Sequence, residues 1–408
     1  MNSYTSYRLD IETTRIAIDM ERLGMPIDRE YLAGKIELIS ALIVHQKGAL
    51  QVMAGINNVG SNDQVIQYLL STGWRPTTFT KTHKPQVSFE VLTGIDDDWV
   101  RSLLDLRKLQ KVLGTYLKPI EFYSRDDSRL HPNFKLDRTA SGRLATGGNN
   151  KGGKKSPLGI PNVNVQNWPR VKEGETDYVR ACIAAGDGMV LCKADYSQLE
   201  LRILAEVAKV PYLIQTFKDG GDAHEATAQA IYGRTSVTKD ERYVAKQVNF
   251  SVVYGAGPDT LAENAQVDLA TAKEVLERIN TVMNLDAYRS KCITTMLNTG
   301  GIHTVDGRLR LLPAIHSSAY KVRSKAIREG VNHTIQGTAA GIAKRAMVLT
   351  APVGGLFNQV HDELVFEWPQ AVAEENMARV VEFMEGAASG ILNQVPLRVD
   401  AELVERYK

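Results

Sequence analysis

The sequence has 408 residues, of which 43% are hydrophobic and 24% charged, which is ordinary for a globular protein with a large core and more than one lobe. Because no apolar run is long enough to cross a bilayer and no signal peptide opens the chain, we expect neither a membrane partner nor secretion. The three cysteines, Cys182, Cys192 and Cys292, are odd in number and lack metal-site spacing, so a reducing cytoplasm is the expected location.

The formal net charge of +2 does not by itself indicate a nucleic-acid-binding protein. Local basic clusters nevertheless occur. One lies among glycines, at Lys151, Lys154 and Lys155, and Arg323 and Lys325 belong to another at the start of an expected helix. Such clusters are usually solvated faces, so on their own they do not predict DNA binding.

Residues 31 to about 123 predict long helices with a polar interruption. Helical spacing defines two apolar faces, which consist of Leu32, Ile36, Ile39, Leu42 and Ile43, and of Leu103, Leu106, Leu109 and Leu113. Between them, Ser61 and Gln64 form a capping-box pattern that predicts the start of a short helix. Residues 80–85 predict an exposed loop.

Asp195 lies where an apolar strand gives way to a helix. Residues 189–192 predict a short buried strand, and Leu199, Ile203 and Leu204 recur at helical spacing just after it. A carboxylate at such a junction is held by rigid backbone and open on one side, which suits a divalent metal bound partly by substrate phosphates. The alternative is that Asp195 caps the helix, because Asp is a preferred N-cap residue.

Further along, the chain predicts helices from residue 206 to about 328. One of them carries Arg242, Lys246, Phe250 and Tyr254, each four residues from the last, on a single face. A core-facing helix rarely aligns two cations with two aromatic residues, although snorkelling makes it possible. Residues 255–257, Gly-Ala-Gly, then predict the end of this helix.

A second stripe at four-residue spacing consists of Arg328, Asn332 and Gln336. It is followed by small residues between 337 and 341, which would let a helix approach another surface closely. An exposed polar face is the alternative interpretation.

The last motif is a hairpin with acids in its turn. Residues 356–360 and 364–367 predict two strands, separated by His361, Asp362 and Glu363, which include no Gly, Pro or Asn to ease a turn. A sequence that needs only a turn would more often use Asn-Gly or Asp-Gly, so these acids point to function. Together, Asp195 and Asp362 could hold two Mg²⁺ ions about 4 Å apart for displacement at phosphorus.

The segments Asp195–Arg202 and Val360–Leu364 resemble motifs A and C of family A DNA polymerases, the bacterial DNA polymerase I group, and the resemblance runs from about Met20 to the C-terminus. It implies an α/β (α+β) right-hand fold with an antiparallel palm sheet, helical fingers and a helical thumb. The expected divisions are an entry segment at 1–30, the thumb at 31–125, the palm at 126–205 and 329–408, and the fingers at 206–328.

The resemblance also implies roles for individual residues. Asp195, Asp362 and the backbone carbonyl of Tyr196 would bind the metal ions, with Glu363 as a supporting acid and Lys246 as a further catalytic group. The incoming dNTP would be contacted by Arg242, Lys246, Phe250, Tyr254, Glu200, Gln198 and His224. Glu200 and Tyr254 would exclude a ribose 2′-hydroxyl, and Phe250 in place of Tyr would disfavour dideoxynucleotides.

DNA contacts follow from the same resemblance, through Arg143, Gln166, Asn167, Arg328, Asn332, Gln336 and His361. The minor groove suits this task because its acceptors are degenerate enough to test pairing without preferring a sequence. Residues 147–159 form a Gly- and Lys-rich loop where the family has a shorter connection, so we expect a disordered insertion there more than a basic loop that contacts DNA phosphates.

The predicted activity is therefore template-directed DNA synthesis on primer–template DNA with dNTPs and two Mg²⁺ ions, for which Mn²⁺ can substitute. The alternatives are a reverse transcriptase, a catalytically silent DNA-binding module, and a metal-dependent phosphoesterase. Asp10 and Glu12 superficially resemble a proofreading exonuclease motif, but the residues around them leave no room for that domain. We expect a monomer without exonuclease or 5′ nuclease, either a phage-like enzyme or a fragment, with a separate exonuclease or processivity factor as a possible partner.

Overall fold

The computed structural model describes residues 3–147, 163–169, 177–254 and 256–407. All but the first residue of the Gly- and Lys-rich loop at 147–159 lie outside these ranges, so the expectation for that loop is not examined by the structure. The chain forms two compact units: unit 1 comprises residues 1–23, 133–147 and 187–405, and unit 2 comprises 24–132, 148–186 and 406–408. The expected division into thumb, palm and fingers remains a prediction.

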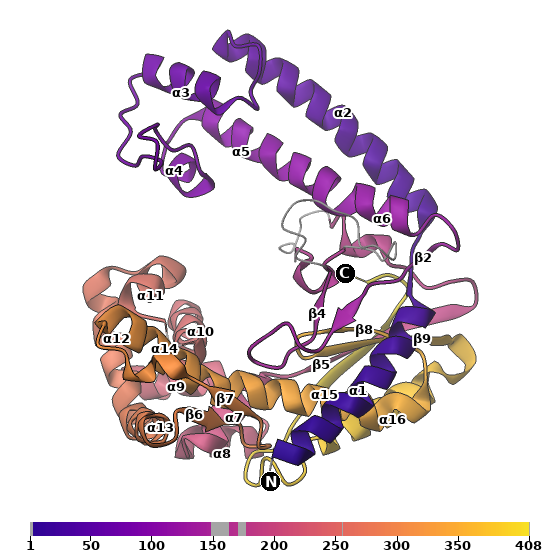
Figure 1. Cartoon of the computed structure of the whole chain (residues 1–408), viewed down its shortest axis with the longest axis vertical. Coiled ribbons are helices and arrows are strands. Elements are labelled where there is room, and N and C mark those ends of the chain that lie inside the picture. Colours follow the sequence, from indigo (N-terminus) through magenta and orange to yellow (C-terminus); the bar gives the residue numbers. More distant parts are fainter. Residues whose placement is uncertain (1–2, 148–162, 170–176, 255, 408) are drawn as a thin grey trace. The chain divides into compact units, whose positions relative to one another are not determined.

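Unit 2 is mainly helical. Its elements are β1 (Met25–Pro26), α2 (Arg29–Ala54), α3 (Asn62–Ser71), α4 (Phe89–Thr93), α5 (Asp98–Lys111), the π-helix η1 (Val112–Leu117), α6 (Lys118–Tyr123), β2 (Arg129–Leu130) and the 3-10 turns η2 (Val165–Asn167) and η3 (Arg180–Cys182). The long helices α2 and α5 lie side by side (Figure 1). Trp99 joins them, because its indole N–H donates to the carbonyl of Leu50 at 3.0 Å inside the core.

The predicted capping box at the start of α3 forms only in part. Ser61 is the N-cap and accepts from the backbone N–H of Gln64, as expected. The side chain of Gln64, however, accepts from the backbone N–H groups of Asn57 and Asn58 instead of reaching back to Ser61. The backbone N–H of Ser61, which the second half of the motif would satisfy, donates instead to the carbonyl of Asn58 at 3.0 Å.

The centre of unit 1 is a four-stranded antiparallel sheet. Its strands are β5 (Met189–Tyr196), β8 (Leu356–Val360), β9 (Glu363–Pro369) and β10 (Val399–Val404), in the order β10-β5-β9-β8. Unit 1 also contains two separate two-stranded antiparallel sheets. One pairs β3 (Phe134–Lys135) with β4 (Ala145–Thr146), and the other pairs β6 (Gly301–His303) with β7 (Leu309–Leu311). This mixture of helices and antiparallel strands confirms the predicted fold class.

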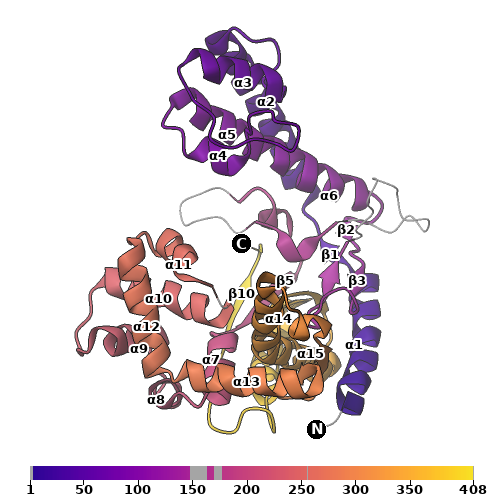
Figure 2. The same cartoon turned by 60° about the vertical axis from the view of Figure 1, so that its left-hand side comes forward.

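The other described elements of unit 1 are helices and helical turns. They are α1 (Ser3–Leu23), α7 (Leu199–Val207), α8 (Pro211–Lys218), α9 (Ala223–Tyr232), α10 (Lys239–Tyr254), α11 (Pro258–Ala265), α12 (Leu269–Val282), α13 (Leu285–Thr299), η4 (Pro313–His316), α14 (Tyr320–Asn332), the π-helix η5 (His333–Gly337), α15 (Thr338–Thr350), η6 (Ala351–Val353), η7 (Gln370–Val372) and α16 (Ala373–Gly386). Helix α1 lies alongside α15, and helices α13, α14 and α15 can be followed in Figure 2. Within the described residues, no helix is both long enough and apolar enough to traverse a bilayer.

The Asp10 carboxylate joins α1 to the rest of unit 1. It accepts hydrogen bonds from Arg308 at 2.6 Å and from the buried Lys344 at 2.7 Å. These two cations neutralise the Asp10 carboxylate inside the fold.

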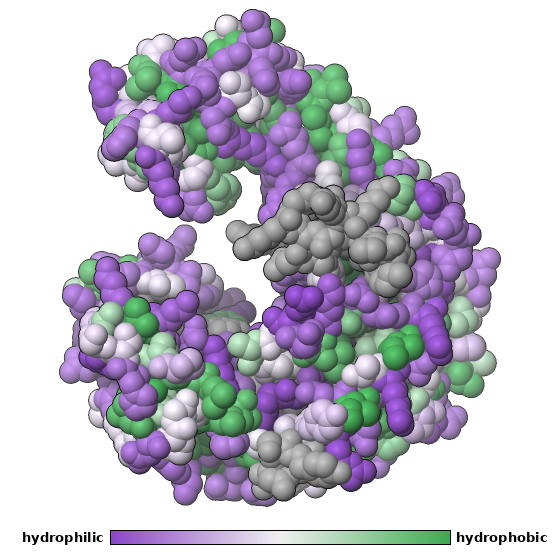
Figure 3. Space-filling model, viewed as in Figure 1, coloured by the Kyte–Doolittle hydropathy of each residue, from purple (hydrophilic) through white to green (hydrophobic). Residues whose placement is uncertain are grey.

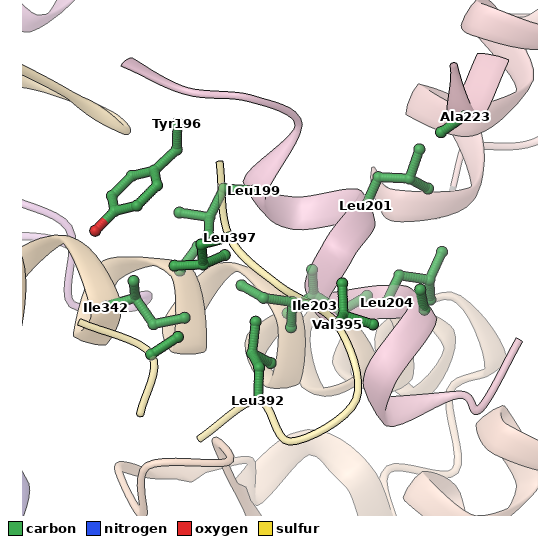
Figure 4. Packing of buried hydrophobic residues seen from close by; sticks show 14 of the residues in the cluster. Tyr196, Leu199, Leu201, Ile203, Leu204, Ala223, Ile342, Leu392, Val395 and Leu397 are labelled. Carbon is green, nitrogen blue, oxygen red and sulfur yellow. The ribbon is translucent and has the colours of Figure 1, made fainter. Parts of the chain in front are cut away.

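The apolar core of unit 1 supports the predicted strand-to-helix junction. Leu199, Ile203 and Leu204 of α7 are buried, as their helical spacing predicts. They meet Ile342 of α15 and Leu397, which precedes β10, in one cluster (Figure 4). Outside such cores, hydrophilic residues cover much of the visible surface of each unit (Figure 3).

Candidate active site

Asp195 is the penultimate residue of strand β5, which extends four residues beyond the predicted apolar run, from 193 to 196. The alternative in which it caps the following helix is wrong. Helix α7 begins at Leu199, and its N-cap position belongs to Gln198, whose backbone is left-handed with φ 56° and whose side chain makes no capping bond. Asp195 is thus held by the sheet, and its carboxylate is not consumed as a cap.

The acidic turn between β8 and β9 has an unfavourable backbone conformation, as its sequence indicates. Val360 pairs with Glu363, so the turn consists of His361 and Asp362 alone, and Glu363 already belongs to β9. His361 adopts a left-handed backbone with φ 58°, which is uncommon for a residue other than glycine. The buried Gln359 supports it, because its side-chain N–H donates to the carbonyl of His361 at 2.5 Å.

The sheet brings the two acidic motifs together. Strands β5 and β9 pair with Asp195 directly opposite Glu363. The backbone N–H of Tyr196 also donates to the carbonyl of Asp362 at 3.3 Å. Residues that face each other across antiparallel strands share one side of the sheet, with Cα atoms about 4.5–5.5 Å apart. Asp195 and Glu363 are therefore neighbours on one side of the sheet, and Asp362 directly precedes Glu363 in the turn.

The donor chemistry of these residues fits a hard divalent cation, which prefers carboxylate and carbonyl oxygens. Asp195 and Asp362 would hold the cation through their carboxylates, and Tyr196, which follows Asp195, would add its backbone carbonyl. Among the described residues, no group of three or more His, Cys, Asp or Glu is arranged to hold a metal by itself.

The ring of Tyr196 is a structural part of this site. It is buried, and its hydroxyl donates to the carbonyl of Met384 at 2.7 Å. Burial and the negative charges of Asp362 and Glu385 raise the pKa of Tyr196 far above its ordinary value. The phenol therefore stays neutral and anchors the strand end that carries Asp195.

Helix α10 carries the predicted cationic and aromatic stripe. Arg242, Lys246 and Phe250 are exposed on it, and 47% of Phe250 is accessible, which is unusual for a phenylalanine. The helix ends at Tyr254 as predicted; the side chain of Tyr254 lies outside the described part of the chain. The exposed side chains are therefore available to a ligand rather than committed to the core.

Two residues that were not predicted to belong to the site, Asp222 and Asn249, contact two that were, Arg242 and His224. Asp222 caps helix α9 and also accepts from the Nε of Arg242 at 3.0 Å, so one carboxylate fixes both. Burial raises the pKa of Asp222, but the hydrogen bonds from Arg242 and from the backbone N–H groups that it caps outweigh this effect. The pKa of Asp222 therefore lies below its ordinary value. Asn249 lies within 3.0 Å of the buried His224 ring. Burial lowers the pKa of His224, which favours a neutral imidazole.

Glu200 and Arg143 contact each other. The guanidinium of Arg143 donates to the carboxylate of Glu200, and both side chains are largely shielded from solvent. Gln198, another residue expected to contact the dNTP, directly precedes helix α7 and is half-buried. The structure thus joins a residue expected to contact DNA to a residue expected to contact the sugar of the dNTP.

The remaining predicted DNA contacts lie on different elements. Arg328 and Asn332 are on α14, whereas Gln336 lies in the π-helix η5, so the uniform four-residue stripe is interrupted after Asn332. His361 is exposed in the β8–β9 turn.

The other two predicted DNA contacts, Gln166 and Asn167, form the 3-10 turn η2 in unit 2. Gln166 is buried there, whereas Asn167 is exposed.

Comparison with known proteins agrees with this geometry. The family model of DNA polymerase family A matches residues 30–408. The chain is 30% identical to DNA polymerase I of Rhizobium leguminosarum over 98% of its own length and 40% of the relative's. It is 33% identical to the thermostable DNA polymerase I of Thermus filiformis, covering 95% of this chain and 46% of the relative.

The chain thus spans less than half of each of these bacterial relatives. A solved structure, the POL domain of Pol1 from M. smegmatis in complex with DNA primer-template and dNTP, matches with a TM-score of 0.84 and 26% identity, covering 97% of this chain and 70% of that one. The right-hand polymerase fold expected from the motifs is confirmed by this match. The chain belongs to DNA polymerase family A.

Proposed function

We propose that this chain catalyses template-directed addition of dNTPs to a primer 3′-hydroxyl. The observation that carries the proposal is the β5–β9 register, which sets Asp195 opposite Glu363 and joins Tyr196 to Asp362. A purely structural hairpin would not need acids on both strands, because like charges placed opposite each other destabilise a sheet. An anionic cluster is useful where divalent cations and phosphates bind.

Different residues of the site have different roles in phosphoryl transfer. Asp195 and Asp362 hold the metals, and Glu363 supports them from the neighbouring register position. Two bound Mg²⁺ ions, or Mn²⁺ in their place, supply Lewis acidity toward the primer hydroxyl and the triphosphate. The exposed Arg242 and Lys246 neutralise charge on the β- and γ-phosphates, and Asp222 keeps Arg242 in place.

Selection of the nucleotide falls to the side chains around Glu200. Glu200, held by Arg143, excludes a ribose 2′-hydroxyl, and the exposed Phe250 packs against the sugar and base. Burial makes His224 neutral, so it contacts the triphosphate as a hydrogen-bonding group rather than as a cation. Tyr254 completes the sugar barrier in this proposal.

The solved relative bound to DNA primer-template and dNTP supports the same partners for this chain. Arg328, Asn332, Gln336 and His361 contact the duplex, with Gln166 and Asn167 of unit 2. We further propose that the protein acts as a cytoplasmic monomer and relies on a separate exonuclease or processivity factor.

Primer extension tests the proposal. The purified chain is given Mg²⁺, a labelled primer on a DNA template, and either four dNTPs or four NTPs. We expect extension with dNTPs only, and no primer shortening without nucleotides. Asp362→Ala should abolish extension and leave duplex binding intact. The matched control is Asp187→Ala, since Asp187 is an exposed acid just before β5.

Two results would contradict the proposal. If Asp362→Ala extends primers normally, the metal site lies elsewhere. If the unaltered chain binds primer–template but never extends it, the chain is a DNA-binding module. Primer shortening that depends on Mg²⁺ would instead indicate a phosphoesterase, and an RNA template in a parallel reaction tests reverse transcription.

A further inference from the structure

Arg308 lies at the centre of a group of contacts inside unit 1. It directly precedes β7, and its guanidinium donates to the Asp10 carboxylate of α1 at 2.6 Å. Only 18% of the Arg308 side chain is exposed, and Lys344 of α15 donates to the same carboxylate at 2.7 Å. Burial raises the pKa of Asp10, but the hydrogen bonds from both cations outweigh this effect, so the carboxylate stays ionised. Asp10 thus anchors the far end of the Arg308 side chain.

The backbone of Arg308 is fixed as well. Its N–H donates to the hydroxyl of Thr304 at 2.8 Å, and its carbonyl accepts from the N–H of Thr304 at 3.0 Å. The Nε2 of His333 lies 3.2 Å from the same carbonyl. The N–H of Val305 donates to Thr338 at 3.1 Å and so ties this loop to α15. Arg308 is therefore held at its backbone and at its guanidinium, as a residue that positions others must be.

The side chain of Arg308 packs against the buried Gly142, in the loop that connects β3 to β4. Gly142 has a left-handed backbone with φ 82°, and a Cβ built there would lie 2.9 Å from the Nε of Arg308. Only glycine permits both the conformation and this approach. Two hydrogen bonds close the turn, from the N–H of Gly142 to the carbonyl of Thr139 at 3.2 Å and from the hydroxyl of Thr139 to the carbonyl of Arg143 at 2.6 Å.

Arg143, the next residue of this turn, reaches the candidate active site. Its guanidinium donates to Glu200, the expected barrier to a ribose 2′-hydroxyl. The pairing of β3 with β4 ends at Lys135 and Ala145, so the turn itself depends on packing contacts such as that of Arg308 with Gly142. A continuous path of contacts therefore leads from Asp10 to Glu200.

We propose that Arg308 is a positioning residue for sugar selection, which packs against Gly142 and so fixes Arg143 beside Glu200. Asp10 holds the guanidinium of Arg308 in the orientation that this requires. Both residues act through the turn and not by contact with the nucleotide. Because sugar selection is measured by nucleotide addition, this inference rests on the proposed polymerase function.

The test measures incorporation of a dNTP and of its rNTP by each variant, below the unfolding temperature of all of them, and thermal unfolding in parallel. Arg308→Met removes both the ion pair with Asp10 and the group that packs on Gly142. The ratio of kcat/KM for the dNTP over the rNTP should fall by about threefold to tenfold, because the barrier is displaced but not deleted. Arg308→Lys keeps a cation for Asp10 but lacks the planar guanidinium, so it should recover thermal stability and not selectivity.

Two further variants separate positioning from stability. Lys344→Met is the matched control, since it removes the other cation from Asp10 without touching the turn. It should lower the unfolding temperature and leave sugar selectivity unchanged. In an Arg143→Met background, Arg308→Met should lower the ratio no further, because the two residues act in series.

Unchanged selectivity in Arg308→Met overturns the proposal whatever its stability, as does an equal loss of selectivity in Lys344→Met. Additive losses in Arg143→Met/Arg308→Met would also overturn it. If Arg308→Met does not fold, Arg308→Lys decides, because normal selectivity in that variant would show that the guanidinium positions nothing. Failure of the polymerase assignment is distinct, since the unaltered chain would then extend no primer with any nucleotide.

Discussion

Arg143 donates a hydrogen bond to Glu200 from 57 residues away, and only 25% and 13% of the two side chains are exposed. The pair links a loop residue expected at the primer end to the residue expected to exclude ribose. Holding a carboxylate by a shielded arginine fixes its position more firmly than an exposed pair would. We therefore expect sugar selection to depend on both residues.

Glu200→Ala should ease ribonucleotide incorporation, because it removes the group that meets the 2′-hydroxyl. The ratio of kcat/KM for a dNTP over its rNTP should fall by roughly tenfold to a hundredfold. Arg143→Met should lower it less, and the double variant should resemble Glu200→Ala because the two act as one unit. Additive losses would show that Arg143 does not position Glu200, and unchanged selectivity in Glu200→Ala would remove Glu200 from the barrier.

Gln359→Ala should slow catalysis without weakening DNA binding. The variant loses the hydrogen bond that supports the left-handed turn at His361, so Asp362 would be less well oriented. Single-turnover rates should fall by about tenfold or more, since small misplacements of catalytic groups are costly. The control is Gln370→Ala at an exposed position after β9. A normal rate for Gln359→Ala would mean that the strands alone hold the turn.

Gly341→Ala should destabilise unit 1, although alanine usually stabilises a helix. A Cβ at this position of α15 would overlap the buried carboxylate of Asp306. Overpacking of this kind costs about 1–3 kcal/mol, which exceeds the helix-propensity gain of about 1 kcal/mol. Thermal unfolding measures the change. Asp306→Ala in the same chain should recover part of the loss, and Gly386→Ala, where nothing lies within 4 Å, should be harmless.

Stability should decrease below neutral pH because of His333. Burial lowers the pKa of His333 to about 4 from 6.5, so between these values the unfolded chain binds the extra proton. The contribution of the neutral ring is complete above pH 6.5 and is lost as the pH falls toward 4, up to about 3 kcal/mol. Urea unfolding from pH 7 to 5 should show a shallower decline for His333→Gln. Identical pH slopes would indicate that other groups cause the decline.

Local patterns in the sequence determined much of this protein. Helical spacing identified α2, α5, α7 and α10, and Ser61 starts a helix where its residue type predicts one. The acidic turn was recognisable because its residues suit a turn poorly. Such features depend on backbone sterics and on the burial of one face, and neighbours in the chain are enough to reveal both.

Only the tertiary structure decided which side chains meet. The sequence did not indicate that Arg143 pairs with Glu200, that Asp222 holds Arg242, or that Asp10 is neutralised by Lys344 from 334 residues away. Nor did it reveal the π-helical turn that contains Gln336 and interrupts the stripe after Asn332. Partners of this kind follow from strand register and helix packing, which depend on the whole core at once. The sequence alone therefore predicted the acids of a metal site, and the fold decided that Asp195 lies opposite Glu363.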